Sequence, residues 1–146
     1  MTGAMEWISN FLYAAMLAGV PLLYGTLGEI LTEKAGNVNL GVEGMMYMGA
    51  VFGFMGAYYL DSAAAALLFA FLGGLGGALV YAFLTVTLKA NQNVAGLTLT
   101  IFGTGLANLL GTNMVNASGS GAAMVSDSIK AIFRPLDMGA LTALPY

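Results

Sequence analysis

Residues 25–50 read GTLGEILTEKAGNVNLGVEGMMYMGA, and this stretch decides how the chain is organised. Apolar sequence runs up to it and away from it. Polar and charged side chains lie inside it, at Glu29, Glu33, Lys34, Asn37, Asn39 and Glu43, and glycines recur at 25, 28, 36, 41, 44 and 49. Polar groups at membrane depth are costly and usually line a cavity or pathway. Broken, glycine-rich backbone between two hydrophobic helices is typical of a transporter's substrate site.

The composition places this stretch in a lipid bilayer. The chain is 59% hydrophobic and 8% charged, and its mean hydropathy is +0.84, whereas a soluble domain carries about 25% charged residues. The net charge of −3 comes without any basic cluster, so we expect no nucleic-acid partner. The chain has no His and no Cys, and we expect no metal, no cofactor and no enzymatic activity.

Four segments are long and apolar enough to cross about 30 Å of hydrocarbon as helices. They run from about Trp7 to Ile30, from Leu40 to Leu60, from Ala63 to Leu88 and from Val94 to Val115. The sequence therefore predicts an all-α, polytopic transmembrane helix bundle of about four spans, with a Gly-rich polar break between the first two. No linker or repeat divides residues 1–146, so we expect a single transmembrane unit. If all four segments span, Lys34 and Lys89 share one side of the membrane.

A polar region follows the fourth predicted span. It begins with a Ser/Gly/Ala-rich loop over 116–126 and continues as a short amphipathic piece that contains Lys130 and Arg134. The residues from Met138 to Tyr146 are apolar enough to begin a fifth span.

The third predicted span carries a pattern typical of close helix packing. Small residues repeat every four positions, and Gly73 and Gly77 form a GxxxG pair beside them. Small residues at this spacing let another helix approach closely. The packing stripe consists of Ala66, Ala70, Gly74, Ala78 and Ala82. Gly49, Gly53 and Gly56 predict the same behaviour for the second span.

The polar residues of 29–44 also allow a purely structural interpretation. Glu29, Glu33 and Lys34 can be the solvated end of the first helix, with Ala35–Gly36 as its C-cap. Asn37 and Asn39 would then be turn residues, and Glu43 would lie in the first turn of the next helix, where the helix dipole favours it.

A second polar patch, Lys-Ala-Asn-Gln-Asn at 89–93, presents the same two alternatives. Its carboxamides both donate and accept hydrogen bonds, which suits hydroxyl-rich or base-bearing neutral ligands. Polar clusters between apolar runs are, however, usually ordinary loops.

Two motifs give the chain a family resemblance. The run LGEILTEKAGNVNLGVEGMMYMGA resembles the signature of the inner-membrane permeases of ABC importers for nucleosides and related sugars, within the branched-chain amino-acid/ribose-type permease superfamily. A second similar stretch is KANQNVAGLTLTIFGTGL, residues 89–106. The first pattern matches at Gly28, Glu29, Glu33, Gly36, Asn39, Gly41, Glu43, Gly44, Met45 and Met46.

The resemblance implies a subunit of an ATP-driven importer in the bacterial plasma (inner) membrane, crossing it several times. Its implied partners are ABC ATPase subunits, a second permease subunit and a substrate-binding lipoprotein. The similarity covers the amino-terminal half of such permeases, so we expect a truncated or split permease. We assign the substrate path to Asn37, Asn39, Glu43, Asn91, Gln92 and Asn93, and structural or gating roles to Glu29, Glu33, Gly36, Gly41 and Gly44.

Two alternatives to this reading stay open on the sequence. The chain can be a small structural or regulatory membrane bundle protein that scaffolds a partner, or a non-functional permease fragment. Neither a G-x-x-x-x-G-K-[ST] nor a G-x-G-x-x-G motif occurs in it, so any ATP hydrolysis would come from a partner.

Overall fold

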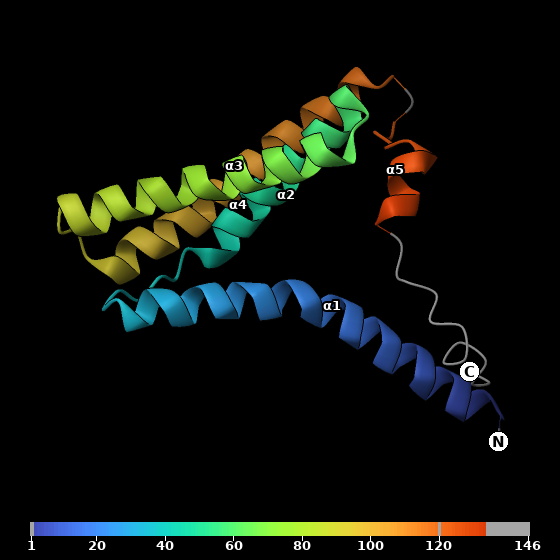
Figure 1. The fold of residues 1–146 in the computed structure, drawn as a ribbon, viewed down its shortest axis with the longest axis horizontal. Coiled ribbons are helices and arrows are strands. Elements are labelled where there is room, and N and C mark those ends of the chain that lie inside the picture. Colours follow the sequence, from blue (N-terminus) through green and yellow to red (C-terminus); the bar gives the residue numbers. More distant parts are fainter. Residues whose placement is uncertain (1, 120, 134–146) are drawn as a thin grey trace.

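The computed structural model describes residues 2–119 and 121–133, and every regular element in that part of the chain is a helix. The elements are α1 (Thr2–Lys34), α2 (Val42–Leu60), α3 (Ala63–Ala82), the π-helix η1 (Phe83–Thr87), α4 (Gln92–Ala117) and α5 (Asp127–Ile132). Helices α2, α3 and α4 lie side by side as a bundle, and α1 runs beside it before diverging (Figure 1). The predicted all-α membrane helix bundle is confirmed.

Three of these helical stretches are long and apolar enough to cross a membrane: Gly3–Lys34, Ala63–Thr87 and Gln92–Ala117. The sequence analysis predicted four, and α2 is the one that differs. At 19 residues it is about 28 Å long, close to the bilayer thickness. Its glutamate, tyrosines and glycines lower its apolar character, and its neighbours cover one face of it. The possible fifth span, Met138 to Tyr146, and Arg134 lie outside the described residues.

Helix α1 is longer than predicted and stands apart from the bundle. Its 33 residues span about 50 Å, more than the hydrocarbon core requires. None of its apolar window is buried, and its packing against the rest of the protein is chiefly with α2. The helix bends near its middle (Figure 1). Pro21 lies inside it, and a proline both removes a helical hydrogen bond and crowds the preceding turn.

Glycines set how closely α2 and α3 pack. A Cβ on Gly53 would lie 2.9 Å from Ala70 Cβ, and one on Gly56 would lie 2.8 Å from the carbonyl oxygen of Ala65. On α3, a Cβ on Gly73 would lie 2.9 Å from the carbonyl oxygen of Met48. These separations are too short for real Cβ atoms, so only glycine permits this distance between the helices. The predicted role of the glycines of α2 is confirmed.

The closest contact between α3 and α2 does not lie on the predicted packing stripe but beside it on the surface of α3. Ala66 is buried and Ala70 meets Gly53, whereas a Cβ on Gly74 would reach only the carbonyl oxygen of Met45, at 3.9 Å. Ala78 is half-buried and Ala82 is exposed. The GxxxG pair Gly73 and Gly77, one residue round the helix, therefore makes the tighter contact with α2.

Helix α4 packs on α2 through its backbone. Gly44 of α2 and Gly103 of α4 lie against each other, and a Cβ on Gly44 would lie 2.6 Å from Thr100 Cα. Two turns before Gly103, a Cβ on Gly96 would lie 2.8 Å from the backbone nitrogen of Leu40 in the connection. Gly96 and Gly103 are thus packing residues that the sequence analysis did not single out.

Helix α5 packs against the α2–α3 hairpin near its turn, at the end away from residues 35–41. Its Ile129 is buried against Ala57 and Ala66, which belong to α2 and α3. Ser126, just before α5, donates a 2.5 Å hydrogen bond to the Asp61 carboxylate in the α2–α3 turn. These contacts fold the polar region after α4 back onto the bundle (Figure 1).

Candidate functional site

The break between the first two helices lies where it was predicted. Helix α1 ends in a Schellman motif, in which the Asn37 amide donates to Thr32 O at 3.1 Å and the Gly36 amide to Glu33 O at 2.9 Å. Gly36 has φ +86°, a left-handed conformation that disfavours other residues. The predicted C-cap at Ala35–Gly36 is confirmed. Residues 35–41 then cross to α2 without regular structure.

Side chains from α1 and α4 hold the amide groups of this connection. The Asn39 amide donates to Glu29 Oε1 at 2.6 Å, and the Val38 amide donates to Gln92 Oε1 at 2.9 Å. The Gln92 amide group also donates to the Asn37 side chain at 3.0 Å and to Gly36 O at 3.4 Å. Gln92 thus binds the connection at three places from the first turn of α4.

The carbonyl groups of the connection have partners in α3 and α4. The Tyr81 hydroxyl donates to Val38 O at 2.6 Å, and the Thr100 hydroxyl donates to Leu40 O at 2.9 Å. Within the connection, the Gly41 amide donates to Asn39 Oδ1 at 2.9 Å, and Asn39 is buried. Non-helical backbone is tolerated at membrane depth only when protein groups or enclosed water satisfy it. The connection therefore packs against α1, α3 and α4 through hydrogen bonds to its backbone.

Tyr81 and Thr100 are the residues of this site that sequence reasoning did not assign. Tyr81 is 5% exposed, and it carries the only polar side chain of helix α3. A buried tyrosine hydroxyl usually has a hydrogen-bond partner, so its presence in the third predicted span was an available signal. Thr100 shares its face of α4 with Gly96 and Gly103, at spacings of four and three residues.

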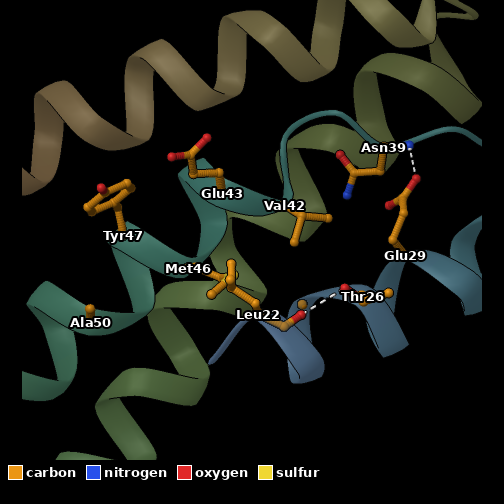
Figure 2. Close-up of a pocket in the computed structure, with 10 residues that line it drawn as sticks. Leu22, Thr26, Glu29, Asn39, Val42, Glu43, Met46, Tyr47 and Ala50 are labelled. Carbon is orange, nitrogen blue, oxygen red and sulfur yellow. Dashed lines mark hydrogen bonds between the residues drawn. The ribbon is translucent and has the colours of Figure 1, made fainter. Parts of the chain in front are cut away.

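A cavity of about 600 Å³ lies between α1 and α2, beside this connection. Glu29 and Thr26 of α1 line it, and Asn39 and Glu43 line it from the connection and α2. Figure 2 shows Glu29 and Asn39 together at one end of the cavity, with Glu43 and Tyr47 on the α2 side. The rest of the lining is mostly apolar: Leu22, Gly25, Val42, Met46 and Ala50.

One buried oxygen of Glu29 has no hydrogen-bond partner among the described residues. Among the described residues, Glu29 Oε2 is the only buried side-chain nitrogen or oxygen that makes no hydrogen bond. The other oxygen of the same carboxylate holds the Asn39 amide. One oxygen of this carboxylate therefore binds the backbone of the connection, and the other makes no hydrogen bond to the described residues.

The residues assigned to the substrate path from the sequence fall into three groups. Asn39 and Glu43 reach the 600 Å³ cavity, together with Glu29 from the structural group. Asn37 and Gln92 meet on another side of the connection, where Asn37 also lines a second cavity of about 220 Å³. Asn91 caps α4, accepting from the amides of Asn93 and Val94 at 3.0 and 3.2 Å, and Asn93 is exposed.

The remaining members of the structural group also have defined places. Gly41 and Gly44 are buried where α2 begins, against α4, and leave no room for a side chain. Glu33 is exposed in the last turn of α1. The structure thus joins the polar segment 29–44 to the patch 89–93 through Gln92, which lies 54 residues after Val38 in the chain.

Comparison with known proteins identifies relatives of the chain. It is 39% identical over 122 residues to the "Putative glucose ABC transporter permease protein TsgC13" of Haloferax volcanii, a match covering 80% of this chain and 36% of that protein. It is 30% identical over 107 residues to the "Guanosine ABC transporter permease protein NupQ" of Bacillus subtilis, covering 69% of this chain and 34% of that protein. No solved structure matches the chain.

These matches establish the family and its place in the cell. The chain spans about a third of the length of these two relatives. The family is one of transporter permeases and is not an enzyme family, and the protein is a multi-pass plasma-membrane protein. Residues 8–135 match the family described as the permease component of branched-chain amino acid transport systems, and the chain belongs to that family of ABC transporter permeases.

Proposed function

We propose that this chain forms part of the translocation path of an ATP-driven importer for a nucleoside or a related sugar-like solute. The observation that carries the proposal is the non-helical connection 35–41, held by side chains of three helices beside a cavity with carboxylates in its lining. Irregular backbone within a membrane helix bundle is typical of transporter binding sites.

The solute class is supported by the two relatives. Their names specify glucose and guanosine, which are both neutral and rich in hydroxyl groups. In this proposal ABC ATPase subunits hydrolyse ATP, a second permease subunit completes the path, and a substrate-binding lipoprotein delivers the solute.

Reconstitution tests the proposal. Candidates for the ATPase, the second permease and the lipoprotein are sought among the genes adjacent to this one. The complete mixture in lipid vesicles should take up radiolabelled guanosine or glucose saturably and only with ATP. A matched mixture without this chain should take up neither solute. Uptake that persists undiminished without the chain would contradict a role in the path and would favour a structural or regulatory subunit.

A further inference from the structure

We propose that the outward face of α4 is an interface with a second copy of this chain, centred on Gly105 and Asn108. Exposed residues follow one line along α4, at alternating spacings of three and four positions. This line, the outward seam, consists of Thr98, Ile101, Gly105, Asn108, Thr112 and Val115. Such spacing keeps residues on the side of a helix that packs against a partner helix. The proposal concerns assembly and does not depend on the solute that the protein carries.

The Asn108 carboxamide is the first argument. Asn108 lies in the middle third of the 26-residue α4, which is long and apolar enough to cross the membrane. None of the described residues makes a hydrogen bond to its side chain. On the same seam, the Thr98 hydroxyl donates to Val94 O at 2.8 Å and so finds a partner within its own helix. A carboxamide without any partner in hydrocarbon is costly, so we expect another molecule to satisfy Asn108.

Helix α3 shows the composition of a surface of this protein that suits lipid. Every exposed residue of α3 is apolar, among them Leu67, Phe71 and Leu79. The outward seam of α4 instead carries an asparagine, two threonines and a glycine. A Cβ on Gly105 would meet nothing within 4 Å, so this glycine serves no close packing among the described residues. Small and polar residues together are typical of a helix–helix interface in the membrane rather than of a lipid-facing surface.

A second copy of the chain matches this seam by symmetry. Two copies inserted in the same direction are related by an axis along the membrane normal, so their α4 helices run parallel and each seam residue faces itself. A carboxamide both donates and accepts, so two facing Asn108 side chains satisfy each other reciprocally. A single asparagine in a helix seam can fix register and oligomeric state. Helix α4 contains no Asp, Glu, Lys or Arg, so its two copies meet without charge repulsion.

Two substitutions on the seam test the interface independently of each other. Asn108→Leu removes the carboxamide and keeps a side chain of similar size, whereas Asn108→Gln keeps the carboxamide. Gly105→Leu fills the open space on the seam. Matched controls make the same changes on α4 away from the seam. They are Asn113→Leu, at an exposed position, and Gly111→Leu, where an added Cβ also meets nothing within 4 Å.

Association is measured on the full chain in lipid vesicles. Each variant carries a donor or an acceptor dye at its amino terminus, and energy transfer at graded protein-to-lipid ratios gives the dimer dissociation constant. Circular dichroism checks that helix content is unchanged. We expect Asn108→Leu and Gly105→Leu each to raise the dissociation constant about tenfold, and Asn108→Gln and both controls to leave it within about twofold of the wild type.

Cysteine cross-linking locates the contact between the copies. The chain contains no cysteine, so each introduced thiol reports on one position. Thr112→Cys, on the seam, should form a disulfide with the same residue of a second copy, because parallel helices bring identical positions together. Leu72→Cys is the control, since Leu72 is exposed on α3 and lies outside the seam, and it should not cross-link.

Three results would overturn the proposal. The first is dimerisation of wild-type strength in both Asn108→Leu and Gly105→Leu, and the second is a wild-type chain that stays monomeric at every protein-to-lipid ratio. The third is cross-linking of Thr112→Cys, in the reconstituted assembly, to a different subunit and not to its own copy, which would assign the seam to that subunit. Solute uptake enters none of these measurements, so the importer proposal can fail while the interface stands, and the reverse.

Discussion

At the scale of single residues, the site is organised by side chains that bind backbone. Glu29, Tyr81 and Gln92 come from three helices, and each holds a different group of the α1–α2 connection. The side chains of Gln92 and Asn39 make their hydrogen bonds to other groups of the protein. The polar side chains that line the 600 Å³ cavity are those of Thr26, Glu29, Asn39, Glu43 and Tyr47.

Tyr81→Phe should destabilise the protein without changing its packing. The substitution removes the donor to Val38 O, and the ring of Phe fills the same buried space. The bond to Val38 O is part-buried, and losing such a hydrogen bond costs about 0.5–1.5 kcal/mol net. Thermal unfolding in detergent should show a lower midpoint for Tyr81→Phe than for the wild type. The midpoint of Tyr59→Phe should equal that of the wild type, because the Tyr59 side chain is 61% exposed. Equal midpoints for all three proteins would show that the Tyr81 hydrogen bond contributes nothing.

At the scale of helices, glycines decide which faces meet. Helix α3 approaches α2 through Gly73 and Gly77, and α4 approaches α2 through Gly103 and the connection through Gly96. In lipid, helix association depends on close packing rather than on hydrophobic burial. The bundle should therefore respond to added methyl groups according to the space at each glycine, and not according to hydrophobicity.

Gly44→Ala and Gly76→Ala test this directly with the same chemical change. An added Cβ at Gly44 would lie 2.6 Å from Thr100 Cα, which is backbone and cannot move aside alone, whereas Gly76 has nothing within 4 Å. Overpacking costs about 1–3 kcal/mol or more, and Gly→Ala in an open helix position gains roughly 0.5–1 kcal/mol. Size-exclusion chromatography after graded heating should show early loss of folded Gly44→Ala only. A Gly44→Ala protein as stable as Gly76→Ala would refute the α2–α4 contact.

Ile129→Ala should release α5 and leave the bundle folded. Ile129 is 4% exposed and packs against Ala57 and Ala66, so most of the apolar contact of α5 is lost with its side chain. Truncating a buried Ile costs about 2–5 kcal/mol, more than a six-residue helix retains by itself. Hydrogen exchange should accelerate over 127–132 and stay unchanged in α3. Ile132→Ala, at a 65% exposed position, is the control; equal exchange in both variants would contradict the docking.

At the scale of the whole molecule, the bundle is only partly covered. Helix α1 has no buried residue in its apolar window, and the cavity lies between it and α2. Polar groups in such a cavity would face lipid unless further helices cover them. The arrangement indicates a protein that needs neighbouring helices to enclose its cavity.

The lone chain should therefore not drive solute uptake. Reconstituted alone in vesicles with ATP inside and outside, it should show guanosine accumulation no higher than empty vesicles. The complete mixture with ATPase, second permease and lipoprotein should accumulate the solute. Saturable, ATP-dependent uptake by the lone chain would refute this prediction.

The sequence alone determined the helices, the break and its cap, because these depend on local composition. Apolar length predicts the long helices, and Gly36 ends α1 because a left-handed residue there costs glycine least. The small residues of α3 likewise predicted close packing, although the closest contact lies at Gly73 and Gly77. The sequence predicted α2 as a fourth span, but its glutamate, tyrosines and glycines lower its apolar character, and the glycines serve contacts with neighbouring helices.

Only the tertiary structure decided which polar groups serve the backbone and which face the cavity. Gln92 lies 54 residues from Val38, and Tyr81 lies 43 residues from it, yet both bind that residue. No local pattern contains this information, because an unpaired backbone group takes its partner from whichever helix packs beside it. The same packing buried one oxygen of Glu29 beside an open cavity, and that arrangement exists only when α1, α2 and the connection are folded together.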